Sequence, residues 1–342
     1  RLFILLTVAV AALVPALPQR GSGPFAGRWD MTVTRGNLTF PSWMEVIDKA
    51  GGPEVRVQLR TGNVRPVAAA KIDGTRLIVT VSAATPARPA EGNRPASPAR
   101  PKLVWELTAS GGKLTGTQTQ GDSAYQLAGV RAPALKHAPP NAWTDPEPLF
   151  NGKDLSGWQP INNTSNDQTG VVKNYWVAKN GELTNESKGP NIRTTRTFGD
   201  FKLHVEYLCP PEENSGIYLR GRYEAQVTPP PVARPVAAAR PPSAPQAGRQ
   251  YSNPFGEVGS IYGMLGPATP PPFRPEWQTY DFTLIGRWVT VIFNGVTTVD
   301  NQEIPGVTGG ALDSNEGEPG PIYFQGDHHG GIRYRNITIS VP

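Results

Sequence analysis

Residues 201–208 read Phe-Lys-Leu-His-Val-Glu-Tyr-Leu, with an apolar side chain at every second position. This period of two is typical of a β-strand that has one face in a core and one face outside it. We expect the core face to hold Phe201, Leu203, Val205 and Tyr207, and the opposite face to hold Lys202, His204 and Glu206. The stretch therefore predicts a sheet packed on one side.

Short runs of the same kind fill the chain on both sides of this stretch. We expect further strands at residues 216–219, 223–227, 260–262, 280–284, 288–293, 322–324 and 332–341. Asn294-Gly295 between two of them is a typical tight hairpin turn. Residues 146–342 are therefore expected to form an antiparallel jelly-roll β-sandwich, interrupted by a low-complexity insert at 229–250.

The region before this sandwich shows the same alternation without any helical period. Eight strands are expected between residues 21 and 131, at 29–33, 43–47, 55–59, 64–72, 77–81, 103–107, 114–118 and 125–130. They favour a small antiparallel β-barrel, and Gly27-Arg28-Trp29 resembles the Gly-x-Trp that opens lipocalin-like barrels. The Pro-rich residues 84–101 are expected to be a disordered loop. The fold class is therefore predicted to be all-β throughout.

The remaining segments suggest processing and spacing. Residues 1–20 resemble a signal peptide, with an apolar run between Arg1 and Arg20, so a bacterial periplasmic or secreted location is expected. A signal anchor is the alternative, although the run is short for a membrane span. Residues 132–145 read as a Pro-rich linker between the two domains. Cys209, the one cysteine, cannot form an internal disulfide.

Length and charge limit the function classes. The 342 residues suit two domains, and the net charge of +5 comes largely from Arg residues in the two Pro-rich segments. The rest of the chain is near neutral, which argues against a nucleic-acid partner, and no stretch after the signal is suited to cross a membrane. The oligomeric state stays open.

If the strands at 201–208, 216–219 and 223–227 are neighbours, their polar side chains share one sheet face. That face would hold His204, Glu206, Tyr218, Arg220, Glu224 and Gln226. A plain solvent-facing sheet is one interpretation. An Arg flanked by two carboxylates and an aromatic ring also suits a ligand rich in hydroxyl groups.

A series of motifs makes residues 147–342 similar to a known family. The motifs are residues 149–158 (Leu-Phe-Asn-Gly-Lys-Asp-Leu-Ser-Gly-Trp), Trp176 with 180–183 (Asn-Gly-Glu-Leu), 198–201 (Phe-Gly-Asp-Phe), 214–217 (Asn-Ser-Gly-Ile), 223–227, 259–263 (Gly-Ser-Ile-Tyr-Gly), 325–328 (Gln-Gly-Asp-His) and 335–337 (Arg-Asn-Ile). Their order resembles the 3-keto-disaccharide hydrolase domain family, which has a concanavalin-like lectin/glucanase jelly roll.

This resemblance implies an exported enzyme that cleaves glycosides carrying a ketone at carbon 3. The ketone acidifies the hydrogen on carbon 2, so that a base can remove it, the carbon-1 substituent leaves, and water adds back. On residue chemistry we expect Glu206 and His328 to transfer protons and Arg220 to stabilise the enolate. Expected substrate-binding residues are Tyr218, Glu224, Gln226, Tyr262, Trp277, Gln325, Asp327 and Arg335.

Departures from the family pattern leave alternatives open. Gly326 is an extra residue between Gln325 and Asp327, which puts the placement of Asp327 and His328 in question. No cofactor is required by the expected chemistry, and calcium bound by loop oxygens around residues 313–318 is an open alternative. A non-catalytic carbohydrate-binding module and a cell-surface scaffold remain the other functional readings, because fold alone does not give chemistry.

Overall fold

The computed structural model describes residues 22–90, 96–161, 173–211, 213–230 and 258–342. Within these ranges the protein is all-β, as predicted, with 22 strands in three sheets and a short 3-10 turn, η1 (Gly23–Phe25). No helix in the described ranges is long and apolar enough to span a membrane. The expected signal sequence and nearly all of the 229–250 insert lie outside the described residues.

The first sheet has nine antiparallel strands in the order β4-β3-β2-β1-β9-β8-β7-β6-β5. Its strands are β1 (Gly27–Arg35), β2 (Leu38–Lys49), β3 (Gly52–Gln58), β4 (Arg65–Pro66), β5 (Ala69–Asp73), β6 (Arg76–Ser82), β7 (Leu103–Ser110), β8 (Lys113–Gln120) and β9 (Ser123–Arg131). All eight strands expected from the alternation are present, the expected 64–72 strand being divided into β4 and β5.

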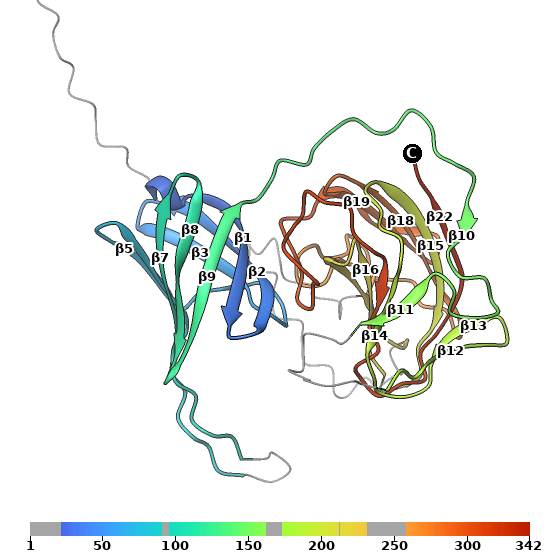
Figure 1. Cartoon of the computed structure of the whole chain (residues 1–342), viewed down its shortest axis with the longest axis horizontal. Helices are drawn as coiled ribbons and strands as arrows, with labels where there is room; N and C mark the ends of the chain where they lie inside the picture. Colours follow the sequence, from blue (N-terminus) through green and yellow to red (C-terminus); the bar gives the residue numbers. More distant parts are fainter. Residues whose placement is uncertain (1–21, 91–95, 162–172, 212, 231–257) are drawn as a thin grey trace, which may run out of the picture.

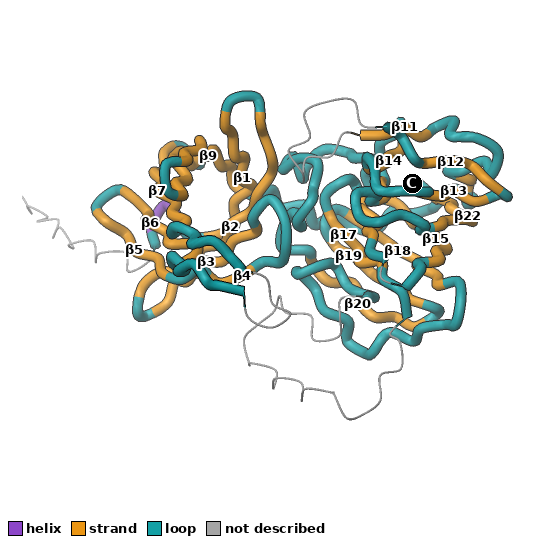
Figure 2. Tube along the Cα trace, turned by 90° about the horizontal axis from the view of Figure 1, so that it is seen from below, coloured by secondary structure: helices purple, strands orange, loops and turns teal. Residues whose placement is uncertain are grey.

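This sheet curls around its own core, as the turned view shows (Figure 2). Its edge strands β4 and β5 are separated in the chain only by Val67 and Ala68. Val67 N donates to Val55 O of β3 at 3.2 Å, and Ala68 N donates to Thr80 O of β6 at 2.8 Å. One bent segment therefore links both edges, which limits the exposed strand edge.

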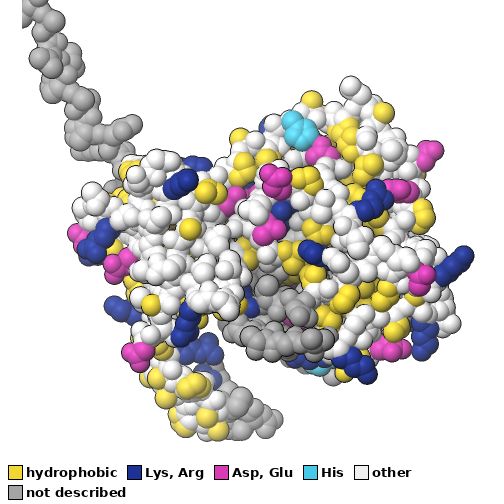
Figure 3. All heavy atoms as spheres, viewed as in Figure 1, with side chains coloured by type: hydrophobic (Ala, Val, Ile, Leu, Met, Phe, Trp, Pro, Cys, Tyr) yellow, Lys and Arg dark blue, Asp and Glu magenta, His cyan; other side chains and the backbone are white. Residues whose placement is uncertain are grey.

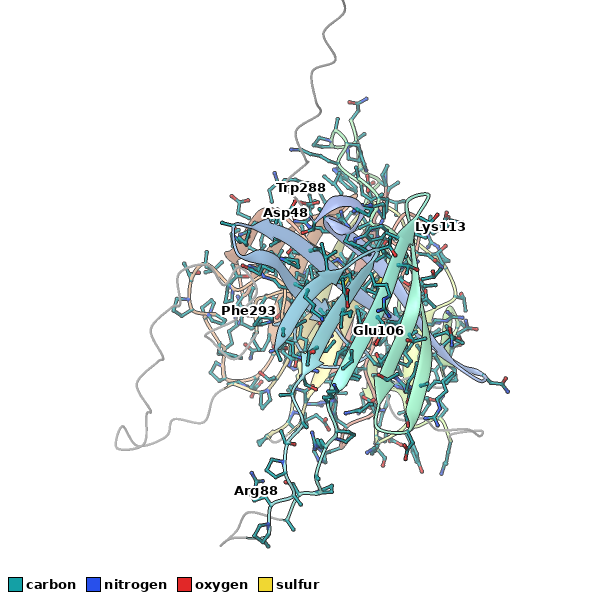
Figure 4. All side chains as sticks on the ribbon, turned by 90° about the vertical axis from the view of Figure 1, so that its left-hand side faces the viewer. Asp48, Arg88, Glu106, Lys113, Trp288 and Phe293 are labelled. Atoms are coloured by element: carbon teal, nitrogen blue, oxygen red, sulfur yellow. The ribbon has the colours of Figure 1, made fainter. Side chains whose placement is uncertain are left out.

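The Pro-rich residues 84–101 differ from the expected disordered loop in their described part. Thr85 pairs with Arg100, and Arg88 pairs with Ser97, so the two sides form an antiparallel arm between β6 and β7. Figure 4 shows Arg88 on this arm, which projects away from the sheet. Four backbone hydrogen bonds of 2.8–2.9 Å satisfy the groups that a solvated loop would leave to water.

The second half of the chain forms a two-sheet sandwich (Figure 1). One sheet has eight strands, ordered β12-β13-β22-β15-β18-β19-β20 with β10 on β22, and the other has five, ordered β11-β14-β21-β16-β17. The larger sheet comprises β10 (Glu147–Pro148), β12 (Trp176–Lys179), β13 (Glu182–Asn185), β15 (Phe201–Leu208), β18 (Gln278–Ile285), β19 (Trp288–Phe293), β20 (Val296–Glu303) and β22 (Arg333–Ser340). The smaller sheet comprises β11 (Trp158–Ile161), β14 (Asn191–Thr194), β16 (Ser215–Leu219), β17 (Tyr223–Val227) and β21 (Tyr323–Phe324).

The predicted faces of β15 are confirmed. Phe201, Leu203, Val205 and Tyr207 are at most 1% exposed and belong to the core between the two sheets. The prediction of a strand at residues 260–262 is wrong, because Ile261 makes only isolated bridges to Ala225 and Leu265. Its short apolar run belongs instead to a buried loop beside β17.

The two domains share a packed interface. Trp43 of β2 is fully buried and belongs to the hydrophobic cluster of the sandwich. A Cβ at Gly306 would overlap the Trp43 indole, so the second domain approaches this ring through a residue without a side chain. Figure 1 shows β1 and β2 on the side of the first sheet that faces the sandwich.

A buried carboxyl pair lies in this interface. Asp30 of β1 is 3% exposed and Glu316 of the sandwich is fully buried. Arg287 Nη1 lies 3.0 Å from Glu316 Oε2, and Tyr223 donates to Glu316 Oε1 at 2.7 Å. Burial, and then the negative charge of Glu316, raise the pKa of Asp30 to about 10. The folded protein therefore holds a proton on Asp30 at neutral pH.

Asp30→Asn is expected to flatten the pH dependence of stability. In the wild type the folded state binds a proton that the unfolded state releases above its ordinary pKa. The free energy of unfolding therefore falls as pH rises from about 4 towards about 10, by up to about 1.4 kcal/mol per pH unit. Asn keeps the shape and cannot ionise. Urea titrations between about pH 5 and pH 9 would measure how the free energy of unfolding changes with pH in the wild type and in Asp30→Asn. Equal slopes in the two proteins would contradict a proton held on Asp30.

Candidate active site

The floor of the site is the hairpin of β16 and β17. Gly216 pairs with Gln226, and Tyr218 pairs with Glu224, in antiparallel register. Alternation along each strand places these four residues on the same face, away from the core residues Ile217 and Ala225. The predicted shared face of Tyr218, Glu224 and Gln226 is therefore confirmed.

A cavity of about 430 Å³ opens above this floor, within the size range of small-molecule sites. It is lined by Thr61, Gly62, Lys188, Asn214, Tyr218, Glu224, Gln226, Tyr262, Gly309, Gly310, Gln325, Asp327 and His328. We call it the interdomain pocket, because Thr61 and Gly62 come from the first domain and the others come from the sandwich.

The loop that carries Asp327 and His328 is bonded to β16. Gln325 N donates to Gly216 O at 3.0 Å, and Ser215 Oγ donates to Gln325 O at 2.8 Å. These bonds hold the loop that carries Asp327 and His328 against the floor. His328 Nε2 lies 3.9 Å from Asp327 Oδ1. This loop therefore places an imidazole and a carboxylate at the same cavity.

Tyr218 supports another part of the pocket lining. Its hydroxyl donates to Gly309 O at 2.9 Å, and the hydroxyl of Tyr323 donates to Gly310 O at 2.7 Å. The two rings are stacked with centroids 3.9 Å apart. Burial, together with the nearby Glu224 carboxylate, raises the pKa of Tyr218 well above its ordinary value. Its hydroxyl therefore stays protonated and serves as a fixed support for the Gly309-Gly310 segment.

The lining is suited to a polar ligand. Lys188 is the only lysine or arginine among the described residues that line the cavity, and it is exposed to solvent. Gln325 Oε1 is a buried atom with no hydrogen-bond partner in the described part of the chain. An acceptor left in this way favours a ligand that donates a hydrogen bond to it, as a hydroxyl group does.

Seven of the eleven site residues expected from the sequence lie in the pocket lining. They are Tyr218, Glu224, Gln226, Tyr262, Gln325, Asp327 and His328. The extra Gly326 does not displace Asp327 and His328 from the cavity. Its own N donates to Asn191 Oδ1 at 2.8 Å, and a Cβ there would crowd Pro190 O at 2.6 Å.

The expectation that Glu206 and His204 share a face with Tyr218 is wrong. Both belong to β15 in the larger sheet, whereas Tyr218 belongs to the smaller sheet. Glu206 accepts from Arg335 Nε and Asn336 Nδ2, each at 2.7 Å. Burial by itself would raise the pKa of Glu206, but these two hydrogen bonds and the Arg335 charge outweigh it, so the pKa is lowered. Glu206 is thus an ion-paired residue outside the pocket lining.

Arg220, Trp277 and Arg335 also lie outside the lining. Arg220 is 4% exposed in the turn after β16, where its Nη2 donates to the hydroxyl of Tyr223 at 3.0 Å. The Arg335 guanidinium stacks on Trp277, 3.9 Å from the ring centroid. Arg220 does not continue the alternation of β16, because its φ of 52° turns the chain at this point.

The sequence missed Lys188, Asn214, Thr61, Gly62, Gly309 and Gly310 as pocket residues. Asn214 stands in one of the quoted family motifs, so the motif was a usable signal for it. Lys188 and the glycines follow strands without any distinguishing pattern. Thr61 and Gly62 belong to another domain, which periodicity within the sandwich cannot reveal.

Carboxylates at the suggested calcium loop are engaged by arginines. Asp313 Oδ1 accepts from Arg222 Nε at 2.7 Å, while Glu316 pairs with Arg287. Within the described ranges, no group of three or more His, Cys, Asp or Glu side chains gathers in a way that would hold a metal ion.

Two structures described as "putative glycosyl hydrolase" from Parabacteroides distasonis are similar to the chain, at 27% and 21% identity. They cover 60% and 58% of this chain and 93% and 92% of their own, with TM-scores of 0.41 and 0.39. A Bacillus subtilis protein with a galectin-like fold is 12% identical and covers 59% of this chain and 97% of its own, with a TM-score of 0.29. No curated protein sequence matched the chain.

A family profile described as the 3-keto-alpha-glucoside-1,2-lyase-like domain matches residues 145–340. This span contains the sandwich, and it contributes every residue of the pocket lining except Thr61 and Gly62. Since the match covers more than half of the chain, the protein belongs to the 3-keto-alpha-glucoside-1,2-lyase-like domain family.

Proposed function

We propose that the interdomain pocket binds a glycoside whose sugar carries a ketone at carbon 3 and cleaves its bond at carbon 1. The observation that carries this proposal is the meeting of His328, Asp327, Glu224 and Lys188 at one cavity within the family domain. Family membership supports action on a carbohydrate. The pocket supplies the acid–base groups and the cation that cleavage beside a ketone needs.

In the proposed reaction His328 removes the proton from carbon 2, and the electron pair moves into the enolate of the carbon-3 ketone. The enolate then collapses, a double bond forms between carbons 1 and 2, and the bond from carbon 1 to the leaving oxygen breaks. The leaving oxygen takes its electron pair and receives the proton from the His328 imidazolium. Addition of water across the double bond completes a net hydrolysis, while release of the unsaturated sugar leaves the reaction as a lyase.

The charges of the lining suit these steps. The Lys188 ammonium is the lining cation that can stabilise the enolate oxygen, a role that the sequence suggested for Arg220. Asp327 Oδ1 lies 3.9 Å from His328 Nε2, so a carboxylate stands beside the proposed base. Glu224, Gln226 and Gln325 provide acceptors for sugar hydroxyl groups.

Incubating the protein with a 3-keto-glucoside of a chromogenic alcohol tests the proposal. Release of the alcohol above the buffer rate is expected, with loss of the carbon-2 hydrogen detected as exchange in deuterated water. Binding of the glycoside without release would identify a non-catalytic carbohydrate-binding module. If the protein neither binds the glycoside nor releases the alcohol, the proposed carbohydrate site is contradicted.

Glu224→Gln is expected to weaken substrate binding by about tenfold or more, because hydrogen bonds to a charged acceptor contribute about 1.5–3 kcal/mol. The residue is 5% exposed and faces the cavity, so water replaces its bonds poorly. The weaker binding should appear chiefly as a higher KM, with a smaller change in kcat. Glu276→Gln, at an exposed position outside the lining, is the matched control. Equal KM values for the two variants would contradict a binding role for Glu224.

We also propose that the protein is exported, from the apolar run within residues 1–20. Expression in a bacterial host followed by fractionation should place the protein in the periplasm or medium. Its N-terminus should then lie within residues 17–22. An intact N-terminus on cell-associated protein would instead favour a signal anchor.

A further inference from the structure

The loop at residues 59–63 is the part of the first domain that reaches the interdomain pocket. It connects β3 to β4, and its Thr61 and Gly62 line the cavity. Thr61 is exposed to solvent. Every other lining residue belongs to the family domain, so this loop is an addition to the site that the family match does not include.

The loop is fixed from within its own domain. Gln58 is fully buried, and its Nε2 donates to Leu59 O and to Gly62 O, each at 2.7 Å. One side chain therefore binds both sides of the turn. A loop restrained in this way presents a shaped surface without a large ordering cost when a ligand binds.

The second domain fixes the loop from the other side. Gly310 N donates to Arg60 O at 2.9 Å. Gly309 approaches so closely that a Cβ there would lie 2.7 Å from Gly62 O. This approach leaves no space for a side chain between the loop and the Gly309-Gly310 segment.

These contacts also show which pocket residues are close to the loop. Gly309 accepts a hydrogen bond from Tyr218, so the loop and the Tyr218 ring contact the same Gly309-Gly310 segment. Asp327 and His328 follow Gln325, whose N donates to Gly216 O on the same strand as Tyr218, and both residues line the same cavity as the loop. The loop is therefore a wall of the cavity that also holds the acid–base groups.

We propose that the loop at residues 59–63 sets the length of glycoside that the interdomain pocket accepts. This inference rests on the proposed function, since it takes the ligand to be a glycoside whose reacting carbons lie near His328. Thr61 lines the cavity and is exposed to solvent, so we expect the further sugar of a longer substrate, which extends out of the pocket, to meet its hydroxyl, a group that both donates and accepts hydrogen bonds. The first domain is thus a determinant of substrate size rather than a separate module.

The test replaces Thr61 with a larger side chain and compares two substrate lengths. We expect Thr61→Trp to lower kcat/KM for a 3-keto-disaccharide by at least about tenfold, while kcat/KM for a methyl 3-keto-glucoside changes by less than about threefold. Thr115→Trp, at an exposed position on β8 away from the pocket, is the control. Unfolding midpoints establish that each variant is folded, and Thr61→Tyr replaces Thr61→Trp if that variant unfolds.

Calorimetric titration with methyl glucoside and with an unoxidised disaccharide provides a readout independent of cleavage. A selective loss of disaccharide affinity in Thr61→Trp supports the inference even if no glycoside is cleaved. Absence of cleavage together with this loss would contradict the proposed function alone. If the wild type cleaves the glycosides and Thr61→Trp changes kcat/KM equally for both substrate lengths, or for neither, the inference is overturned and the proposed function stands. Absence of both binding and cleavage in the wild type overturns both.

Discussion

His328→Ala should reduce the turnover of a 3-keto-glycoside by about 100-fold or more, the range expected when a general acid–base group is removed. In the proposed reaction this imidazole both takes the carbon-2 proton and returns it to the leaving oxygen. The variant should keep its fold, because His328 lies on a half-buried loop at the cavity and outside both hydrophobic clusters. Steady-state kinetics with a chromogenic 3-keto-glucoside, and exchange of the carbon-2 hydrogen, would measure the loss.

The neighbouring His329 supplies the matched control. It is exposed and absent from the pocket lining, and its backbone N donates to Glu213 Oε1 at 3.2 Å. We expect His329→Ala to retain turnover within about twofold of the wild type. Near-full activity of His328→Ala in a folded protein would show that another group removes the proton.

Glu206→Gln separates the sequence-based hypothesis from the structure-based one. The sequence suggested Glu206 as a second proton-transfer group, whereas the structure places it against Arg335 and Asn336 on the other sheet. A loss of turnover comparable with that of His328→Ala would restore Glu206 to the mechanism. Retained turnover together with a lower unfolding midpoint would agree with its ion pair.

Trp43→Ala is expected to lower the free energy of unfolding by about 3–5 kcal/mol, as for other buried large aromatic residues. The ring is fully buried, and it belongs to the core cluster of the sandwich although it lies on β2 of the first domain. Its removal should therefore leave a cavity between the domains. Urea titration monitored by tryptophan fluorescence and by circular dichroism would measure the change.

Trp288 on β19 is a suitable comparison, because it lies half-buried under Lys136 at the surface. We expect Trp288→Ala to cost less than about 1 kcal/mol. If Trp43→Ala costs no more than this, the two domains do not share a core.

Surface charge agrees with the near-neutral composition outside the Pro-rich segments. On the face seen in Figure 3, Lys and Arg side chains are interspersed with Asp and Glu. The cavity likewise mixes Lys188 with Glu224 and Asp327. A mixed field of this kind suits a neutral, hydroxyl-rich ligand, whose recognition depends on individual hydrogen bonds rather than on long-range attraction.

The amino-acid sequence by itself determined the local features of this protein. Alternation predicted the strands of the first sheet and the buried face of β15, and it placed Tyr218, Glu224 and Gln226 together on one hairpin. Asn294-Gly295 predicted the turn between β19 and β20, where both residues have positive φ. These features follow from steric rules that act over a few residues, so a short window of sequence contains them.

Only the tertiary structure decided which strands share a sheet and which segments meet at the cavity. Alternation gives the face on which Glu206 lies but not its neighbouring strands, and β15 pairs with β18 and β22 rather than with β16. The contact between Gly309 and Gly62 likewise joins residues of different domains, at a distance that no local pattern encodes. Sheet order and domain docking depend on packing between segments far apart in the chain. The pocket is lined by residues of both domains, so local sequence patterns could not predict it.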